Sequence, residues 1–370
     1  MTGQLAGRRI ALTLATSTGG VGAHVRSLIE PLTAAGADLS VFGPAATEEL
    51  FRFSTVGARF APVEIAASPR PARDARAAAR LYRLTRHCDL VHAHGLRAGL
   101  VAVLAGTGRS RPTVLTLHNA LLDPPGPRRR ILELLERLVC RRADLVLAVS
   151  GDLLARALRA GAGDVRPAPV AAPPLGESSR SAADVRAELG AVDRPLILAL
   201  GRLHEQKGYD VLVPAAARWA SREPVPLVAV AGSGPLEAQL RTQIAELRAP
   251  VRLLGRRADV ADLLNAADIV VLPSRWEGWP LVAQEALRAG RPLVTTAVGG
   301  LPDLVGDGAV LVRPDDVDAL DAAVRRLLDD PAAAEALRRA ATARAQHLPT
   351  EQDTAGQVVA VYAELLGAAQ

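Results

Sequence analysis

Residues 268–294, DIVVLPSRWEGWPLVAQEALRAGRPLV, contain the unit from which the fold can be predicted. The apolar run at its start has the length and composition of a buried strand, and the segment up to Pro280 is typical of a loop. A helix is predicted from Leu281, and a second apolar run follows it. A strand, a helix and another strand in succession form the connection that joins parallel strands.

The same alternation of short apolar runs and helical stretches recurs along almost the whole chain. Near-continuous Val, Leu and Ile runs are typical of parallel strands buried on both faces. The pattern therefore predicts a doubly wound α/β fold. The runs are at 8–15, 38–44, 89–95, 112–119, 144–150, 194–202, 225–234, 251–255, 268–274, 292–300 and 308–314.

The alternation breaks once, in RPAPVAAPPLGESSRS at 166–181, which has the composition of a linker. Two Rossmann-like domains are therefore predicted, at 1–172 and 173–351, with a C-terminal helix at about 352–370 that packs back on the first domain. Ligands of such folds bind at the carboxyl ends of the strands, so the site is expected in the cleft between the domains.

Cysteine content and hydropathy favour a cytoplasmic protein. The two cysteines, Cys88 and Cys140, form neither a disulfide framework nor a metal-binding spacing. The longest apolar run, at 98–106, is shorter than the roughly 18 to 20 residues that span a bilayer. Arg8 and Arg9 before an apolar stretch resemble a signal peptide, but threonines and a glycine loop interrupt it, so a first strand is predicted.

The net charge of +5 is unevenly distributed. Residues 1–170 contain 23 arginines and 13 acidic residues, whereas the rest of the chain is net acidic. A basic first domain could face anionic lipid or another acidic acceptor. Nucleic acid is not expected, because this half has few aromatic side chains for stacking and no known reading motif.

A basic helix is predicted at Arg70–Arg86, in RPARDARAAARLYRLTRH. Its arginines follow one face, beside an apolar stripe of Ala77, Leu81 and Leu84. Such a helix could make a peripheral contact with an anionic membrane. The favoured alternative is that Leu81 and Leu84 pack on the sheet beneath a solvated arginine face. The membrane alternative stays open because of a second basic cluster, Arg128–Arg130 with Arg141 and Arg142.

Three segments contain candidate binding residues. In STGGVGAH (17–24), glycines after the first strand would let backbone N–H groups approach an anion, although a tight turn explains them equally well. In GRLHEQKG (201–208), Arg202 and Lys207, the only lysine of the chain, could bind a diphosphate. The alternative is a solvated loop.

The third segment is the one quoted first. Glu277 lies in its loop, and Glu285 lies one turn into its helix. A loop carboxylate could hold sugar hydroxyls, and a helix carboxylate could bind the two hydroxyls of a ribose. The Gly278–Val282 backbone could bind phosphate. The alternative is a pair of surface acids near a helix start, where the helix dipole stabilises them.

A metal site is not expected. The D-x-D triplet Asp316-Val317-Asp318 is predicted to start a helix with an acidic N-cap. Of the seven histidines, His24, His92, His94 and His118 lie near strand ends or loops in the first half. His92 and His94 are expected to alternate faces along a strand, and a single such histidine is more often structural than catalytic.

Taken together, these motifs resemble the retaining glycosyltransferases of family four, which have the GT-B fold. The resemblance rests on the glutamate pair Glu277 and Glu285, on the PS before it and the AL-AG-P after it, and on the GRL…KG loop. AGSGP at 231–235 and LLG at 253–255 also match. The similarity extends over essentially the whole chain and is dense in its second half.

The resemblance implies a role for each candidate residue. Arg202 and Lys207 would bind the donor diphosphate and stabilise the leaving group, and Glu285 would bind the ribose. Glu277 would hold hydroxyls of the transferred sugar, and His118 would lie beside that sugar. The remaining implied contacts with substrate are at Gly19, Gly20, His94, Gly232, Gly255, Arg256, Gly278, Trp279, Pro280, Leu281 and Val282.

The resemblance thus implies a retaining, metal-independent hexosyltransferase that needs no cofactor. Its donor would be a UDP- or GDP-linked sugar, and its acceptor a glycan, a lipid or a small metabolite. No residue is assigned as a nucleophile, since a same-face attack through an ion-pair-like state is the usual proposal for this family. A nucleotide-sugar epimerase and a non-catalytic nucleotide-sugar-binding protein are the alternatives.

Overall fold

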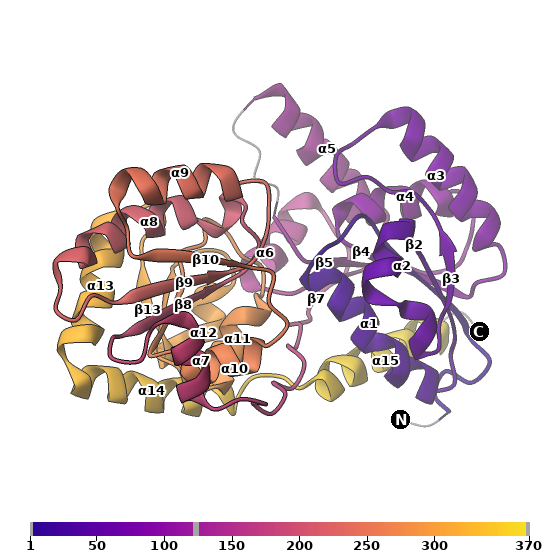
Figure 1. Ribbon diagram of the computed structural model, residues 1–370. Coiled ribbons are helices and arrows are strands. Elements are labelled where there is room, and N and C mark those ends of the chain that lie inside the picture. Colours follow the sequence, from indigo (N-terminus) through magenta and orange to yellow (C-terminus); the bar gives the residue numbers. More distant parts are fainter. Residues whose placement is uncertain (1–2, 121–125, 368–370) are drawn as a thin grey trace. The chain divides into compact units, whose positions relative to one another are not determined.

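The computed structural model describes residues 3–120 and 126–367, which fold into two compact units (Figure 1). The N-terminal unit contains the chain up to Pro173 together with the segment from Pro349 onward. The C-terminal unit is Pro174–Leu348. The first division lies one residue from the predicted boundary, and the chain returns to the N-terminal unit three residues before the predicted 351/352 boundary.

The N-terminal unit is built on a parallel sheet with the strand order β3-β2-β1-β4-β5-β6-β7 in the described residues. The direction of winding reverses between β1 and β4, where Ile10 pairs with Leu90 and Leu14 pairs with His94. The strands are β1 Arg9–Leu14, β2 Asp38–Gly43, β3 Arg59–Pro62, β4 Leu90–His94, β5 Thr113–Leu117, β6 Leu145–Ala148 and β7 Val165–Pro167.

Helices cover this sheet and form its main core with it. The last helix of the chain packs against α1 and contributes Tyr362, whose buried hydroxyl lies 2.6 Å from His92 Nδ1. The helices are α1 Gly20–Ala34, α2 Ala45–Phe51, α3 Pro71–Leu84, α4 Leu96–Gly106, α5 Pro127–Arg142, α6 Gly151–Ala160 and α15 Glu351–Gly367, with the 3₁₀ turn η1 Phe53–Val56.

The C-terminal unit repeats the design with the order β10-β9-β8-β11-β12-β13. Its winding reverses between β8 and β11, where Ile197 pairs with Ile269. The strands are β8 Leu196–Leu200, β9 Leu227–Ala231, β10 Val251–Gly255, β11 Ile269–Leu272, β12 Leu293–Thr296 and β13 Val310–Val312.

Apolar cores lie on both faces of this second sheet. The helices that form them with the strands are α7 Ala182–Leu189, α8 Tyr209–Ala217, α9 Glu237–Leu247, α10 Val260–Ala266, α11 Leu281–Arg288, α12 Leu301–Val305, α13 Val317–Asp329 and α14 Pro331–Ala345. The 3₁₀ turns are η2 Glu205–Lys207, η3 Arg218–Ser221 and η4 Gly306–Gly308.

The predicted doubly wound α/β fold is therefore confirmed. The sequence did not indicate the edge strands β3 and β7, because RFAP and VRP are short and each ends in proline. The predicted helix start at Asp316 is confirmed, since its carboxylate accepts the backbone N–H of Ala319 at 2.8 Å. None of the described helices is both long and apolar enough to cross a membrane.

The packing of the basic helix α3 agrees in part with the favoured alternative, in which its apolar stripe packs on the sheet. Ala77 and Leu81 are buried beneath an exposed arginine face, as that interpretation predicts. The expectation that Leu84 also packs on the sheet is wrong, because 38% of its surface is exposed at the end of the helix.

Gly208 lets the loop after β8 meet the loop after β11. Its φ of +64° is unfavourable for other L-residues, and a Cβ there would lie 2.0 Å from the carbonyl oxygen of Pro273. Gly190, at the end of α7, has a similar φ of +68°, but no atom lies within 4 Å of the corresponding Cβ position. A substitution at Gly190 therefore tests backbone strain alone, whereas the same substitution at Gly208 tests backbone strain together with the steric cost of bringing two loops together.

We predict that Gly208→Ala destabilises the C-terminal unit more than Gly190→Ala does. Gly190→Ala should cost about 1 kcal/mol through its left-handed backbone. Gly208→Ala should cost roughly 2 kcal/mol more, because the two loops must also separate. Chemical denaturation of both variants measures this difference, and equal losses would show that the loop contact does not constrain position 208.

Candidate functional site

The loops after β8 and β11 form a cluster at the carboxyl edge of the second sheet. Gln206 donates through its side-chain amide to the carbonyl oxygen of Trp276 at 2.9 Å. The backbone N–H of Arg275 in turn donates to the carbonyl oxygen of Gln206 at 2.8 Å. Because the strand order reverses between β8 and β11, these loops flank the place where doubly wound sheets bind ligands.

The centre of this cluster is an ion pair between Lys207 and Glu277. Lys207 Nζ lies 2.5 Å from Glu277 Oε1, and the two side chains are 15% and 7% exposed. Ser274 Oγ donates to the same carboxylate oxygen at 2.7 Å, and Gln206 Nε2 lies 3.4 Å from the other one. The lysine offsets the charge of a carboxylate that is withdrawn from water.

Arg202 lies outside this ion pair. Its side chain is exposed and makes no hydrogen bond or ion pair with the described residues. The structure therefore brings Lys207 to Glu277 and leaves the Arg202 guanidinium available to a ligand. A free guanidinium at the end of a buried strand suits the bidentate recognition of a phosphate.

Helix α11 starts directly after this loop. Its N-cap is Pro280, and no side chain caps its first N–H groups, so the Gly278–Val282 region can bind an anion. Glu285 lies one turn into the helix and is partly buried. Burial raises its pKa, and the nearby Arg288 opposes that shift.

Glycines bring the neighbouring strand ends close together. The N–H of Gly232 donates to the carbonyl oxygen of Gly255 at 2.8 Å. A Cβ on Gly232 would lie only 1.8 Å from the carbonyl oxygen of Gly201. Gly255 has a φ of +70° with open space around its Cβ position, and the next residue, Arg256, is exposed. Residues at the ends of β8, β9 and β10 thus form one continuous edge.

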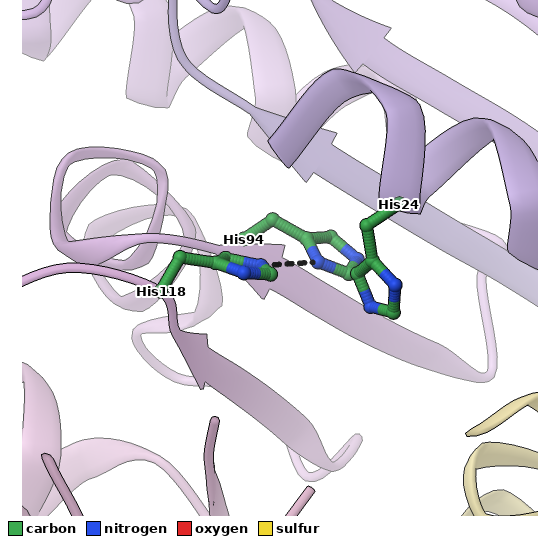
Figure 2. Close-up of side chains that lie close together, drawn as sticks. All are labelled: His24, His94 and His118. Carbon is green, nitrogen blue, oxygen red and sulfur yellow. Dashed lines mark hydrogen bonds between the residues drawn. The ribbon is translucent and has the colours of Figure 1, made fainter. Parts of the chain in front are cut away.

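The N-terminal unit has its own cluster, in which three imidazoles converge (Figure 2). His24 comes from α1, His94 ends β4, and His118 follows β5. His94 Nδ1 lies 3.2 Å from His118 Nε2, and the His24 ring centre lies 5.5 and 5.3 Å from theirs. β1, β4 and β5 are adjacent in the sheet, so the loops that follow them meet at its reversal point.

Gly19, the N-cap of α1, and Gly20, its first residue, are both exposed, and Ser17 Oγ accepts the N–H of Gly22 at 3.1 Å. The N–H groups of Gly20 and Val21 make no hydrogen bond with the described residues, so the start of α1 offers them to a ligand shortly before His24. This is the combination expected of a site for a polar or anionic group.

Burial keeps these imidazoles neutral. Burial lowers the pKa of His24 to about 4. Burial and then the neighbouring histidines place the pKa values of His94 and His118 well below their usual range. His24 Nδ1 and His94 Nε2 are buried without a hydrogen-bond partner among the described residues. Neutral rings with unpaired nitrogens can exchange hydrogen bonds with a substrate hydroxyl.

The three histidines are also the candidate metal ligands of the described residues, since one nitrogen from each lies within 4.8 Å of the others. The expectation that His92 and His94 alternate faces is wrong. Residues two apart on a strand share a face, and the two ring centres are 4.1 Å apart. His92 is held by Tyr362 and by Thr116 Oγ1, each at 2.6 Å. The absence of a metal site stays a prediction.

Several residues of these clusters were not predicted as site residues. Ser274 belonged to a recognised dipeptide, but its bond to Glu277 could not be predicted from spacing. Gln206 lies within the GRL…KG loop as an ordinary polar residue. Tyr209 is fully buried, and its hydroxyl, without a partner among the described residues, lies 2.9 Å from where a Cβ on Gly201 would be. In the sequence, the position of Tyr209 directly after Lys207-Gly208 was the one feature that could have marked it as a site residue.

Comparison with known sequences places both units in one family. Residues 182–344 match the family described as Glycosyl transferases group 1, and residues 19–176 match the Glycosyl transferase 4-like domain. D-inositol 3-phosphate glycosyltransferase of Salinispora arenicola is 33% identical over 324 residues, which cover 77% of this chain and 71% of that protein. Glycogen synthase of Mycobacterium tuberculosis is 40% identical over 154 residues, but these cover only 40% and 37% of the two chains.

Solved structures support the same assignment at the level of the fold. Sucrose-phosphate synthase from Thermosynechococcus elongatus has a TM-score of 0.82 at 24% identity, covering 98% of this chain and 100% of that chain. Anabaena HepE in complex with UDP-glucose has a TM-score of 0.81 at 21% identity, covering 96% and 99%. Two Rossmann-like units of this kind define the GT-B class. The chain belongs to the group 1 glycosyltransferases and is a glycosyltransferase.

Protonation of the buried histidines should make the N-terminal unit acid-sensitive. An unfolded imidazole binds a proton near pH 6.5, whereas folded His24 does so only near pH 4. Between these values the unfolded state binds more protons, so the free energy of unfolding falls as the pH falls. The loss amounts to about 1.4 kcal/mol per pH unit for each such imidazole.

We predict that His24→Gln flattens the decrease of Tm between pH 7 and pH 5 relative to the parent protein. The matched control is His347→Gln, because His347 is exposed and belongs to the other unit. Thermal unfolding followed by circular dichroism at several pH values measures both slopes. A His24→Gln slope as steep as that of the parent would contradict the assignment of a neutral, buried imidazole.

Proposed function

We propose that the protein is a retaining, metal-independent hexosyltransferase that moves a sugar from a nucleoside diphosphate to an acceptor. The C-terminal unit binds the donor, and the N-terminal unit binds the acceptor. The observation that carries this proposal is the arrangement after β8 and β11: a free Arg202, the buried Lys207–Glu277 pair and the uncapped start of α11.

Two cations and a helix N-terminus suit a diphosphate leaving group. Departure of the nucleoside diphosphate builds negative charge on its phosphate oxygens, and prearranged positive charge lowers the barrier to that step. Arg202 offers a planar fork and Lys207 a compact ammonium. The backbone from Gly278 to Val282 adds uncapped N–H groups. These groups provide the charge that a divalent metal supplies in other sugar transferases.

Both carboxylates of the only D-x-D triplet in the sequence already have structural partners, which favours the metal-independent mechanism. Asp316 caps α13, and Asp318 pairs with Arg218 at 2.7 Å. Neither carboxylate lies in the loops that contain Lys207 and Glu277. The diphosphate charge is therefore assigned to Arg202 and Lys207 rather than to an ion held by this triplet.

The two glutamates have separate tasks in this proposal. Glu277 accepts hydrogen bonds from hydroxyls of the transferred sugar once the diphosphate draws the Lys207 ammonium away from the Glu277 carboxylate. Glu285 accepts the ribose hydroxyls, and its raised pKa reflects a burial that a polar ligand would relieve. Gly232, Gly255 and Arg256, which share the edge of β8 to β10, line the space for the base. The complexes of Anabaena HepE with UDP and UDP-glucose support a UDP-linked donor, with GDP as the alternative.

The acceptor is assigned to the N-terminal unit only by chemical class. His94 and His118 are neutral hydrogen-bonding groups, and Gly19 and Gly20 offer N–H groups to an anion. Such a site accepts hydroxyls beside a phosphate or another acidic group. A relative that glycosylates D-inositol 3-phosphate supports an acceptor of this kind. A glycan, a lipid headgroup and a small metabolite all meet the requirement.

A donor panel in the presence of EDTA tests the proposal. UDP- and GDP-sugars are incubated with polyol phosphates, glycans and lipid acceptors, and release of nucleoside diphosphate is followed. We expect transfer that EDTA does not reduce, and a product whose anomeric configuration, read by NMR, equals that of the donor. Epimer formation from donor alone, an inverted product, loss of transfer in EDTA, or binding of a donor without turnover would each contradict it.

We predict that Lys207→Arg lowers kcat/KM by about tenfold or more although the charge is kept. The Lys207 side chain is only 15% exposed and passes Gly201, where an added Cβ would lie 3.2 Å from Lys207 Cε. A broader, planar guanidinium would have to be accommodated in this largely buried place beside Glu277, so its geometry differs from that of the ammonium. Lys207→Ala and Glu285→Ala should each remove most of the transfer activity and leave the fold intact.

The matched control is Arg241→Lys on α9, because Arg241 is 61% exposed and its ion pair among the described residues is with Glu237, one turn earlier in the helix. This swap should leave kcat/KM unchanged. Steady-state kinetics with the donor identified above compare the variants, and circular dichroism checks their folding. A Lys207→Arg enzyme with parental kcat/KM would show that position 207 supplies charge alone.

A further inference from the structure

Helix α5 has an apolar face that the described residues leave exposed. Ile131, Leu134 and Leu138 are 57%, 59% and 38% exposed. Their spacing of three and four residues places them on one side of the helix. The opposite side buries Val139 and Cys140 and packs against α4. The helix is therefore apolar on two sides, and only one of them is used for folding.

The charged residues around this exposed face are strongly basic. α5 contains six arginines and two acidic residues. Both acids are already paired, Glu133 with Arg129 at 2.9 Å and the buried Glu136 with Arg156 at 2.5 Å. The exposed arginines that make no ion pair with the described residues are Arg130, Arg137, Arg141 and Arg142.

The basic helix α3 lacks this combination. Its arginine face is exposed, but Ala77 and Leu81 of its apolar stripe are buried, which leaves Leu84, 38% exposed at the end of the helix, as the exposed member of the stripe. Tyr82 is an exposed residue of α3, but the Arg109 guanidinium covers one face of its ring, at 3.9 Å from the ring centre. α3 therefore offers charge with little apolar surface, whereas α5 offers both on one exposed face.

We propose that α5 docks the protein on an anionic lipid bilayer. Ile131, Leu134 and Leu138 insert at the boundary of headgroups and acyl chains, and the surrounding arginines contact lipid phosphates with their stems along the apolar region. The unpaired positive charge selects a negative surface, and the aliphatic stripe selects one that accepts apolar side chains. A bilayer provides both over the length of the helix. This inference is independent of the donor and acceptor proposed above.

Vesicle sedimentation with the full chain tests the proposal. The probes are vesicles of phosphatidylcholine alone and of phosphatidylcholine with phosphatidylglycerol. We expect binding to the anionic vesicles, weaker binding at high salt, and little binding to the neutral ones. The double variant Ile131→Ser/Leu134→Ser should lower the partition coefficient about tenfold, and Arg130→Gln/Arg137→Gln should reduce the salt-sensitive part.

The matched control is Leu158→Ser on α6, because Leu158 is similarly exposed, at 55%, but does not belong to this face. It should bind anionic vesicles like the parent protein. Circular dichroism melting shows whether each variant is folded. In a separate experiment, a fluorophore is attached at position 134 or at position 158 of the otherwise parental chain, and its emission reports which of the two sites enters the apolar layer of the bilayer. Absence of binding to anionic vesicles, parental binding by the α5 double variant, or an equal loss with Leu158→Ser would overturn the proposal. So would retention of the protein by an acidic protein surface but not by vesicles.

Discussion

The contact on which the candidate donor site depends is the ion pair between Lys207 and Glu277. The Glu277 side chain is only 7% exposed, so its carboxylate requires a partner, and the single lysine of the chain supplies it from the neighbouring loop. The pair fastens the loop after β8 to the loop after β11. The close approach at Gly208 holds the same two loops together. The bond from Gly300 N–H, in the loop after β12, to the Glu277 carbonyl oxygen at 3.1 Å holds the loop after β11 from its other side. The cluster is therefore held together by contacts within the chain.

Both units place their polar clusters where the strand order reverses. In the C-terminal unit this is the β8/β11 edge, with its cations and carboxylates. In the N-terminal unit it is the β1/β4/β5 edge, with neutral imidazoles at His24, His94 and His118. The difference in charge fits a division of labour in a group 1 glycosyltransferase. In the proposed function, the first edge would offset the charge of a leaving diphosphate, and the second would offer hydrogen bonds without a net charge of its own.

Much of this arrangement could be predicted from the sequence, because buried parallel strands leave near-continuous apolar runs and the loops after them have recognisable residues. Arg202, Lys207, Glu277 and Glu285 were identified as candidates in this way. Spacing could not show that Lys207 bonds to Glu277 while Arg202 stays free, since that depends on how two loops far apart in the sequence meet. The approach of His24 to His94 has the same cause. The exposed face of α5 was hidden because its apolar residues have the same helical spacing as those of a core helix.

Calorimetric titration with the nucleoside diphosphate of the identified donor tests the central claim most directly. The proteins compared are the parent, Lys207→Met and Glu277→Gln. If the diphosphate draws Lys207 away from Glu277, Lys207→Met weakens binding of the nucleotide. Glu277→Gln, which releases the lysine in advance, binds it as tightly as the parent or more tightly and yet loses sugar transfer. Parental affinity in Lys207→Met, or weaker nucleotide binding in a folded Glu277→Gln, would contradict the account.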